Sequence, residues 1–406
     1  MLSDRLSRLK MGFWTSLAVA LIASLGVIAF LRFTRGLGAV THLSNAFPWG
    51  LWIGFDVLCG VGLAAGGFAV TATVHILHLK EFKPIVRPTV LTAFLGYLLV
   101  IAGLVFDLGK PWNIWHPIIM WNPHSVMFEV GWCVMLYTTV LSLEFAPIVL
   151  ERFKLDFLLK LLKTVTPVLV IMGVILSTLH QSSLGSLFLI LPEKMHPLWY
   201  TPMLPVFFFV SALAAGLAMT VVESWFSRRA FRKPIETHLL SRLSRVSVVV
   251  LALYFTLRMR DLVSRDALRT LFPLSMVSVM FLVEVCLGVV VPMVLLAFER
   301  FRQSPRRLAI AHGMVVLGFI FHRLNVSVTA IEAATGRSYL PSLMEFIVSA
   351  GLVALGMTIF LLACRYLPVF PEGALAAEET ARQAEEASRQ RAVAPVQRPA
   401  TAFDRT

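Results

Sequence analysis

The sequence predicts an all-α protein that crosses a membrane about ten times. Of its 406 residues, 58% are hydrophobic and only 15% are charged, and the mean hydropathy is +0.80. A membrane-spanning helix needs roughly 20 apolar residues, and ten stretches of about that length follow one another along the chain. A composition this apolar excludes an ordinary soluble globular domain.

The spans follow in order with short polar connections. The predicted spans are residues 12–31, 50–74, 88–106, 125–149, 165–190, 203–226, 244–263, 272–298, 308–331 and 344–367. Three basic residues precede the first span and Arg32 closes it, so we expect an uncleaved anchor and no signal peptide. One transmembrane domain is therefore expected over residues 1–371. A polar tail that we expect to be disordered follows at 372–406.

Basic residues indicate the orientation of the chain. On the side of the termini lie 26 of the 36 Lys and Arg residues, 9 lie on the opposite side, and Arg323 falls inside a span. Because short cytoplasmic loops are enriched in Lys and Arg, both termini are predicted to be cytoplasmic, in the inner membrane of a bacterium. The net charge of +13 is therefore a topology signal, and no nucleic acid partner is expected.

Polar residues inside the spans gather near the outer, periplasmic side. A charge at bilayer depth costs a few kcal/mol, so such residues are rarely there without a function. Six predicted helices contribute a residue at similar depth, which suggests a shared pocket. The members of this outer group are Asp56, Asp107, Glu129, His180, Gln181, Arg258, Asp261, His322 and Arg323.

Structural alternatives remain open for several of these residues. His180 also fits a hydrogen-bonded core histidine, and Arg258 and Asp261 also fit a surface ion pair. Asp107 also fits a residue that caps the end of a helix. The four cysteines show no CxxC spacing and are interpreted as inert, and no metal site is expected.

A second set of acids lies deeper: Glu144, Glu223 and Glu284. Glu144 follows Glu129 on the same helix by fifteen residues, or roughly 22 Å along the axis, with an angular offset of about 60°. Acids at successive depths are typical of a proton path, although acids that snorkel from helix ends give the same pattern.

Aromatic residues are frequent in the outer connections. Most fit an interfacial belt, while some also fit the mouth of a site for a flat ring. A lipid-borne quinone would enter from the bilayer and need a proton donor or acceptor at each carbonyl. Asp56, Glu129 and His180 have suitable chemistry. The residues concerned are Trp49, Trp52, Trp112, Trp115, Trp121, Trp132, Trp199 and Tyr200.

Several strings resemble the polysulfide reductase NrfD family, and within it the membrane subunits of periplasmic Ni/Fe-hydrogenases and of menaquinone reductase. They are FPWGLWIGFD at 47–56, SVMFE at 125–129, LEFAP at 143–147, LHQSSLGS at 179–186 and HPLW at 196–199. The resemblance covers about residues 30–370. It implies ten helices, arranged as two four-helix bundles with flanking helices.

The resemblance also implies a function. A periplasmic ferredoxin-like iron–sulfur subunit, joined to catalytic subunits such as a Ni/Fe-hydrogenase, would exchange electrons with menaquinone or ubiquinone. Asp56, Glu129 and His180 match the quinone-side positions, and Glu144 and Glu223 match inner acids linked to proton transfer. Lys110, His124 and His322 depart from the hydrogenase subunit, so the partner enzyme stays open.

The main hypothesis is a quinone-reactive membrane subunit that is not catalytic alone. Glu129 and His180 would exchange protons with quinone, Asp56 would orient it or deliver protons, and Gln181, Arg258 and Arg323 would complete the site. No haem is expected, although His180 and His322 are the pair that would have to bind one. The alternatives are a proton-coupled secondary transporter, for which no internal repeat is evident, and a passive membrane anchor.

Overall fold

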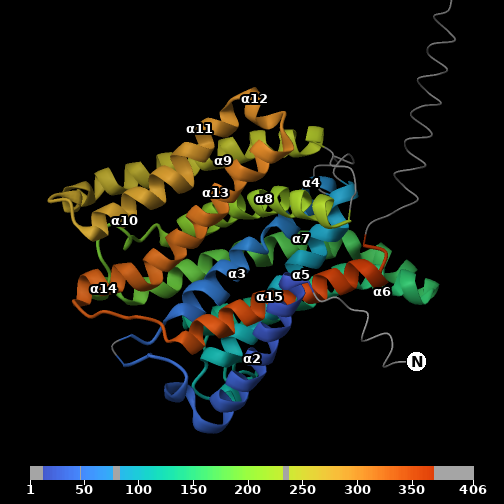
Figure 1. Ribbon diagram of the computed structural model, residues 1–406, viewed down its shortest axis with the longest axis horizontal. Coiled ribbons are helices and arrows are strands. Elements are labelled where there is room, and N and C mark those ends of the chain that lie inside the picture. The colour runs from blue at the N-terminus through green and yellow to red at the C-terminus, as the bar shows by residue number, and fades with distance from the viewer. Residues whose placement is uncertain (1–11, 46, 76–82, 232–236, 370–406) are drawn as a thin grey trace, which may run out of the picture.

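The computed structural model describes residues 12–369 except 46, 76–82 and 232–236, and helices dominate this part of the chain (Figure 1). Nine of the helices within it are long and apolar enough to cross a membrane. They are Phe13–Arg35, Trp52–Ala72, Ile85–Asp107, Val126–Phe153, Asp156–Ile190, Leu204–Phe226, Met276–Ala297, Pro305–Thr335 and Leu343–Tyr366. The chain is therefore a multi-pass membrane protein, as predicted. The tail expected at 372–406 lies outside the described residues.

The first bundle is formed by the second to fifth spans. These helices pack around one another through a core that includes Tyr97, Tyr137 and Leu141. Its elements are η2 (Trp52–Val57), α3 (Leu58–Leu63), α4 (Gly66–His75), α5 (Lys83–Asp107), α6 (Val126–Phe153) and α7 (Asp156–Ser186).

The second bundle is formed by the predicted spans 203–226, 244–263, 272–298 and 308–331, which pack together in the same way. Its elements are α8 (Leu204–Phe231), α9 (Thr237–Ser264), α10 (Met276–Val285), η9 (Cys286–Val290), α11 (Val291–Ala297), α12 (Glu299–Arg302), α13 (Pro305–Leu324), η10 (Asn325–Thr329) and α14 (Ala330–Thr335). Helix α9 covers the predicted span 244–263. It carries four arginines and is outside the nine apolar spans.

Two helices flank the bundles. Helices α2 (Phe13–Arg35) and α15 (Leu343–Tyr366) pack on each other, and α15 also packs on α5 (Figure 1). The two-bundle arrangement with flanking helices thus agrees with expectation. Short 3-10 turns occur in the connections: η1 (Leu37–Ala39), η4 (Pro111–Asn113), η5 (His116–Ile118), η6 (Leu187–Ile190), η7 (Pro192–Lys194) and η8 (Ala267–Leu271).

Glycines allow the two bundles to approach closely. A Cβ added to Gly66 on α4 would lie 2.6 Å from the carbonyl oxygen of Gly216 on α8, which is too close for any side chain. The small-residue sequence at 62–67 therefore serves helix packing.

Three spans contain a π-helical turn, a feature that is rare and often found at functional sites. Asp56 lies within η2, Glu284 comes two residues before η9, and Asn325 begins η10. Turns η2 and η10 lie against each other. Gly54 of η2 is so close to η10 that a Cβ added to it would lie 3.4 Å from the Cβ of Ser327. The fold therefore concentrates irregular backbone around the polar residues of its spans.

Candidate functional site

In the first bundle, helices α6 and α7 bring Glu129 into contact with Ser183, about one helical turn along α7 from His180. The Ser125 hydroxyl caps the start of α6, which places Glu129 in the first helical turn. The Glu129 side chain is exposed, and its Oε1 accepts a 2.6 Å hydrogen bond from Ser183 on α7. His180 precedes Ser183 by three residues and therefore shares its helix face. Its ring is fully buried, with Nδ1 2.8 Å from the Tyr97 hydroxyl.

A line of polar side chains continues from His180 towards Glu144. The rings of Tyr97 and Tyr137 meet edge to face at 4.6 Å between centroids. Tyr137 lies beside Ser177 of α7, and Oε1 of Glu144 lies 3.4 Å from where a Cβ on Gly173 would sit. Because Gly173, Ser177 and His180 recur at helical spacing, this line follows one face of α7.

The neighbours of Asp56 differ from those of Glu129 and His180. Its Oδ2 accepts a 2.6 Å hydrogen bond from Ser349 on α15, and Gly103 of α5 packs against its Cβ. The described contacts of Asp56 are with α5 and α15 and do not include Glu129 or His180. Gln181 also points elsewhere, because its amide donates a 3.0 Å hydrogen bond to the carbonyl of Val61 in α3.

Glu284 is the centre of a buried group in the second bundle, which we call the Glu284 group. Its Oε1 lies 2.8 Å from Nδ1 of His322 and 3.7 Å from the Arg258 guanidinium. Its Oε2 accepts 2.8 Å hydrogen bonds from the Trp199 indole and the Asn325 amide. Three hydrogen-bond donors and the charge of Arg258 therefore offset the burial of a carboxylate that would be very costly to bury alone.

Two arginines lie at this depth. Arg258 is 2% exposed and donates to the Leu198 carbonyl, whereas Arg323 is fully buried and donates to Ser211 and to the Phe208 carbonyl. The Arg323 guanidinium also lies 3.6 Å from the centre of the Phe208 ring, a favourable cation–π contact. Arg258 and Arg323, which were predicted to take part in quinone binding, thus both lie in the second bundle.

The interpretation of Arg258 and Asp261 as a surface ion pair is wrong. Arg258 is buried against Glu284, whereas Asp261 pairs with Arg265 at 2.7 Å and accepts a hydrogen bond from Thr201. Sequence spacing suggested the pair because three residues separate them on one helix.

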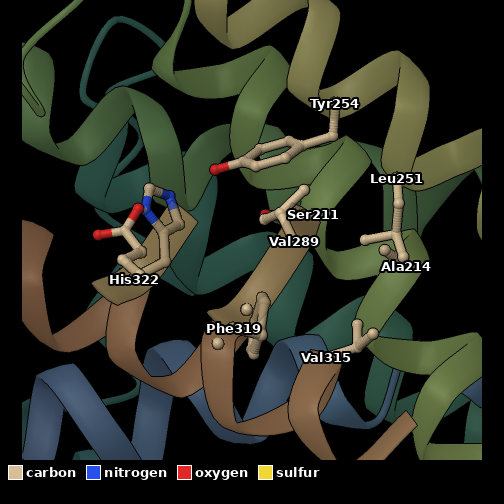
Figure 2. Close-up of a pocket in the computed structure, with 11 residues that line it drawn as sticks. Ser211, Ala214, Leu251, Tyr254, Val289, Val315, Phe319 and His322 are labelled. Carbon is tan, nitrogen blue, oxygen red and sulfur yellow. Dashed lines mark hydrogen bonds and ion pairs between the residues drawn. The ribbon is translucent and has the colours of Figure 1, made fainter. Parts of the chain in front are cut away.

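A small cavity of about 20 Å³ adjoins the Glu284 group, enough for one water molecule. Figure 2 shows the ring of His322 and the hydroxyl of Tyr254 directed towards the same space from different helices. Most of its remaining lining is apolar. The lining residues are Ser211, Ala214, Leu251, Tyr254, Glu284, Gly288, Val289, Val315, Gly318, Phe319 and His322.

The outer aromatic residues divide into two kinds. Trp112 and Trp121 are 67% and 65% exposed, consistent with an interfacial belt. Trp199 is fully buried and Trp52 is 1% exposed, so the belt interpretation is wrong for these two. Their indole groups donate instead to Glu284 and to the Glu345 carbonyl.

The sequence did not predict four hydrogen-bond partners of the candidate site residues: Tyr97, Ser183, Asn325 and Ser349. Asn325 and Ser349 are polar residues inside predicted spans, which was an available signal. The inner acid Glu223, on α8, lies beside Thr92 of α5 and is outside the Glu284 group.

A further buried carboxylate joins distant parts of the chain near the start of η2. Glu345 forms a capping box with Ser342 at the start of α15 and also accepts hydrogen bonds from the Tyr339 hydroxyl and the His42 backbone. Tyr339 in turn accepts a hydrogen bond from the Leu51 backbone at 2.9 Å. Burial and the bond to Glu345 raise the pKa of Tyr339 above its usual range.

Comparison with known proteins shows that this chain is similar to membrane subunits of oxidoreductase complexes. The chain is 38% identical to a Nitratidesulfovibrio vulgaris protein whose name states no function, over 85% of this chain and 91% of that protein. It is 35% identical to the probable Ni/Fe-hydrogenase 2 b-type cytochrome subunit of Escherichia coli, over 84% of this chain and 88% of the relative. It is 28% identical to the menaquinone reductase integral membrane subunit of N. vulgaris, over 85% and 88% of the two chains.

The family assignment covers most of both bundles. Residues 39–333 match the family described as polysulphide reductase, NrfD, and the match extends from before η2 to within α14. With the membrane fold and a relative of 35% identity, this match shows that the chain belongs to the polysulphide reductase NrfD family.

Proposed function

We propose that this chain is the quinone-reactive membrane subunit of a respiratory oxidoreductase complex in a bacterial inner membrane. A periplasmic iron–sulfur subunit, joined to catalytic subunits such as a hydrogenase, exchanges electrons with menaquinone or ubiquinone at this chain. Both termini face the cytoplasm in this proposal. The relatives named as hydrogenase and menaquinone reductase subunits support it.

The arrangement of Glu129 and His180 carries the proposal. Glu129 is exposed on a span, which suits a group that meets a substrate arriving from the bilayer, and Ser183 fixes one of its oxygens. Reduction of a quinone consumes one proton at each carbonyl oxygen. Glu129 and His180 are the proton-exchanging groups, and Tyr97 holds the imidazole through Nδ1.

The polar line across the first bundle supplies the proton path. Tyr97, Tyr137 and Ser177 lie between His180 and Glu144, so that hydroxyl groups bridge the distance between the two helix ends. Protons move along this line between the quinone and the cytoplasmic side. Asp56 holds α15 against the same bundle, and Gln181 joins α7 to α3 within it.

Electron transfer in this chain proceeds without haem in our proposal. A membrane b-type haem usually needs two histidines on facing helices. His180 bonds Tyr97 in the first bundle, while His322 bonds Glu284 in the second, and these separate roles support the proposal. A reduced-minus-oxidised optical spectrum of the purified chain should lack a sharp α-band, and such a band would contradict this point.

Substitution of Glu129 tests the proposed function. The complex is purified through a tag on this chain and assayed with a short-chain menaquinone analogue and with a soluble dye. Glu129→Gln should lower quinone turnover by about a hundredfold or more, the usual loss for a general acid or base. Dye turnover and subunit composition should not change.

Glu151→Gln is the matched control. Glu151 lies on the same helix, α6, but pairs with Arg87 at 2.8 Å. This variant should retain quinone turnover. Equal turnover of Glu129→Gln and the control would reject the assignment and favour a passive anchor.

A further inference from the structure

The Glu284 group contains a histidine with one free nitrogen beside a cavity. His322 uses Nδ1 to bond Glu284, and among the residues that the structure describes Nε2 has no hydrogen-bond partner. His322 is 3% exposed and lines the cavity of about 20 Å³. A buried polar atom without a hydrogen-bond partner is costly, so an internal water bonded to Nε2 is expected.

The cavity meets the conditions for such a water. Its volume admits one molecule, and its polar lining consists of Glu284, His322, Tyr254 and Ser211. The Tyr254 and His322 rings approach to 6.2 Å between centroids, at a steep angle (Figure 2). The lining elements come from four helical spans, so the site lies inside the second bundle.

We propose that Glu284, His322 and one water in this cavity form a proton-exchange centre of the second bundle. The proposal rests on the proposed quinone function, and it adds a centre separate from the line between Glu129 and Glu144. That line follows α6 and α7 in the first bundle, whereas the Glu284 group is held by α9, α10, α13 and η10.

The proton step is balanced within the group. The cavity water gives a proton to Nε2 of His322, which forms an N–H bond there, and the N–H bond at Nδ1 breaks as its proton passes to Oε1 of Glu284. The water regains a proton from its supply side, and Glu284 releases one on the other side. Rotation of the imidazole about its Cβ–Cγ bond then turns the protonated nitrogen towards Glu284 and the unprotonated one towards the water, so that one proton has moved from the water side to the Glu284 side with no electrons transferred.

Charges around the group favour transit of the proton over its storage. Arg258 on α9 and Arg323 on α13 face the single carboxylate of Glu284, while Tyr254, Trp199 and Asn325 are neutral neighbours. Like charges repel strongly at low dielectric. A proton that arrives at Nε2 is therefore matched by release at Nδ1.

Helix α13 provides a matched control. His312 lies on the same helix, is fully buried, and has Nδ1 bonded and Nε2 without a partner among the described residues. Its Nδ1 partner is the backbone carbonyl of Leu308, however, and it does not line the cavity. A histidine-to-glutamine change at each position therefore separates the proton role from the loss of a buried imidazole.

Proton movement by the complete complex tests the proposal. The tagged complex is placed in liposomes that contain a pH-sensitive dye, and turnover is driven by reduced methyl viologen with a short-chain menaquinone analogue. The measurement is the number of protons that cross the membrane per electron delivered to quinone. His322→Gln and Glu284→Gln should slow proton transfer at the centre by about a hundredfold and thereby lower the number of protons that cross per electron. His312→Gln should keep it.

Equal proton yields in all three variants would overturn the centre without touching the proposed function. No proton movement by the unaltered complex during normal quinone turnover would overturn both this centre and the proton path proposed for the first bundle, but not the quinone reaction. Loss of quinone turnover in the unaltered complex would instead reject the proposed function. A second measurement is independent of turnover. A cryo-EM map that resolves waters should show one between His322 and Tyr254, and an empty cavity there would refute the proposal.

Discussion

Ser349 on α15 donates a 2.6 Å hydrogen bond to Asp56 in the π-helical turn of the second span. The two residues are separated by 293 positions in the chain. Helix α15 is fixed about one turn earlier by the capping box of Glu345, whose carboxylate also binds the Tyr339 hydroxyl. The last span is thus attached to the second span at two adjacent polar contacts.

Removing the Ser349 hydroxyl should loosen this attachment. An intramolecular hydrogen bond typically contributes about 0.5–1.5 kcal/mol, and Asp56 is only 8% exposed. Ser349→Ala should therefore lower the melting temperature of the detergent-solubilised protein. Thr358→Ala is the control, because the Thr358 hydroxyl bonds only the Ala354 carbonyl of its own helix. Equal melting temperatures of the two variants would mean that the contact contributes nothing.

Alkaline pH should weaken the contact between Tyr339 and Glu345. Because the folded protein raises the pKa of Tyr339, the folded state keeps its proton at pH values where the unfolded chain has lost it. Stability from this residue is complete below about pH 10, the ordinary tyrosine pKa, and falls as the pH rises further. Tyr339→Phe should be less stable at neutral pH and should lose less stability between neutral and alkaline pH. Melting curves across this range measure the difference, and parallel curves would contradict it.

Tyr97 should act by positioning His180. Tyr97→Phe removes the hydroxyl 2.8 Å from Nδ1 while preserving the ring that packs on Tyr137. Quinone turnover should fall by about tenfold, less than the loss expected for a direct proton donor. The pH profile of turnover should also shift, because the imidazole loses its fixed partner. Tyr366→Phe, at an exposed position on α15, is the comparison, and an unchanged profile for Tyr97→Phe would exclude the positioning role.

The sequence predicts the spans well because each depends on a local run of apolar residues. It predicts several polar residues of the sites for the same reason: a charge inside an apolar run is visible without knowledge of the fold. The partners are not predictable in this way. His322 and Glu284 are 38 positions apart, Trp199 and Glu284 are 85 apart, and only the packing of helices brings them together.

Two features of the sites leave little trace in the sequence. The π-helical turns η2, η9 and η10 depend on tertiary packing, and their residues resemble those of any apolar helix. The separation of Asp56 from Glu129 and His180 depends on which face of each helix points inward. Depth in the membrane follows from residue number, whereas direction requires the three-dimensional packing.

The close approach of α4 and α8 should tolerate little added volume. Gly66→Ala would place a methyl group 2.6 Å from the Gly216 carbonyl oxygen, so the helices must separate, at a cost of about 1–3 kcal/mol. Gly313→Ala on α13 is the control, because a Cβ there meets nothing within 4 Å. That change should be neutral or stabilising by about 0.5–1 kcal/mol, since alanine favours the helix. In detergent, Gly66→Ala should therefore have a lower melting temperature than the unaltered protein, and Gly313→Ala an equal or higher one. A Gly66→Ala variant as stable as Gly313→Ala would show that the bundles can separate without loss.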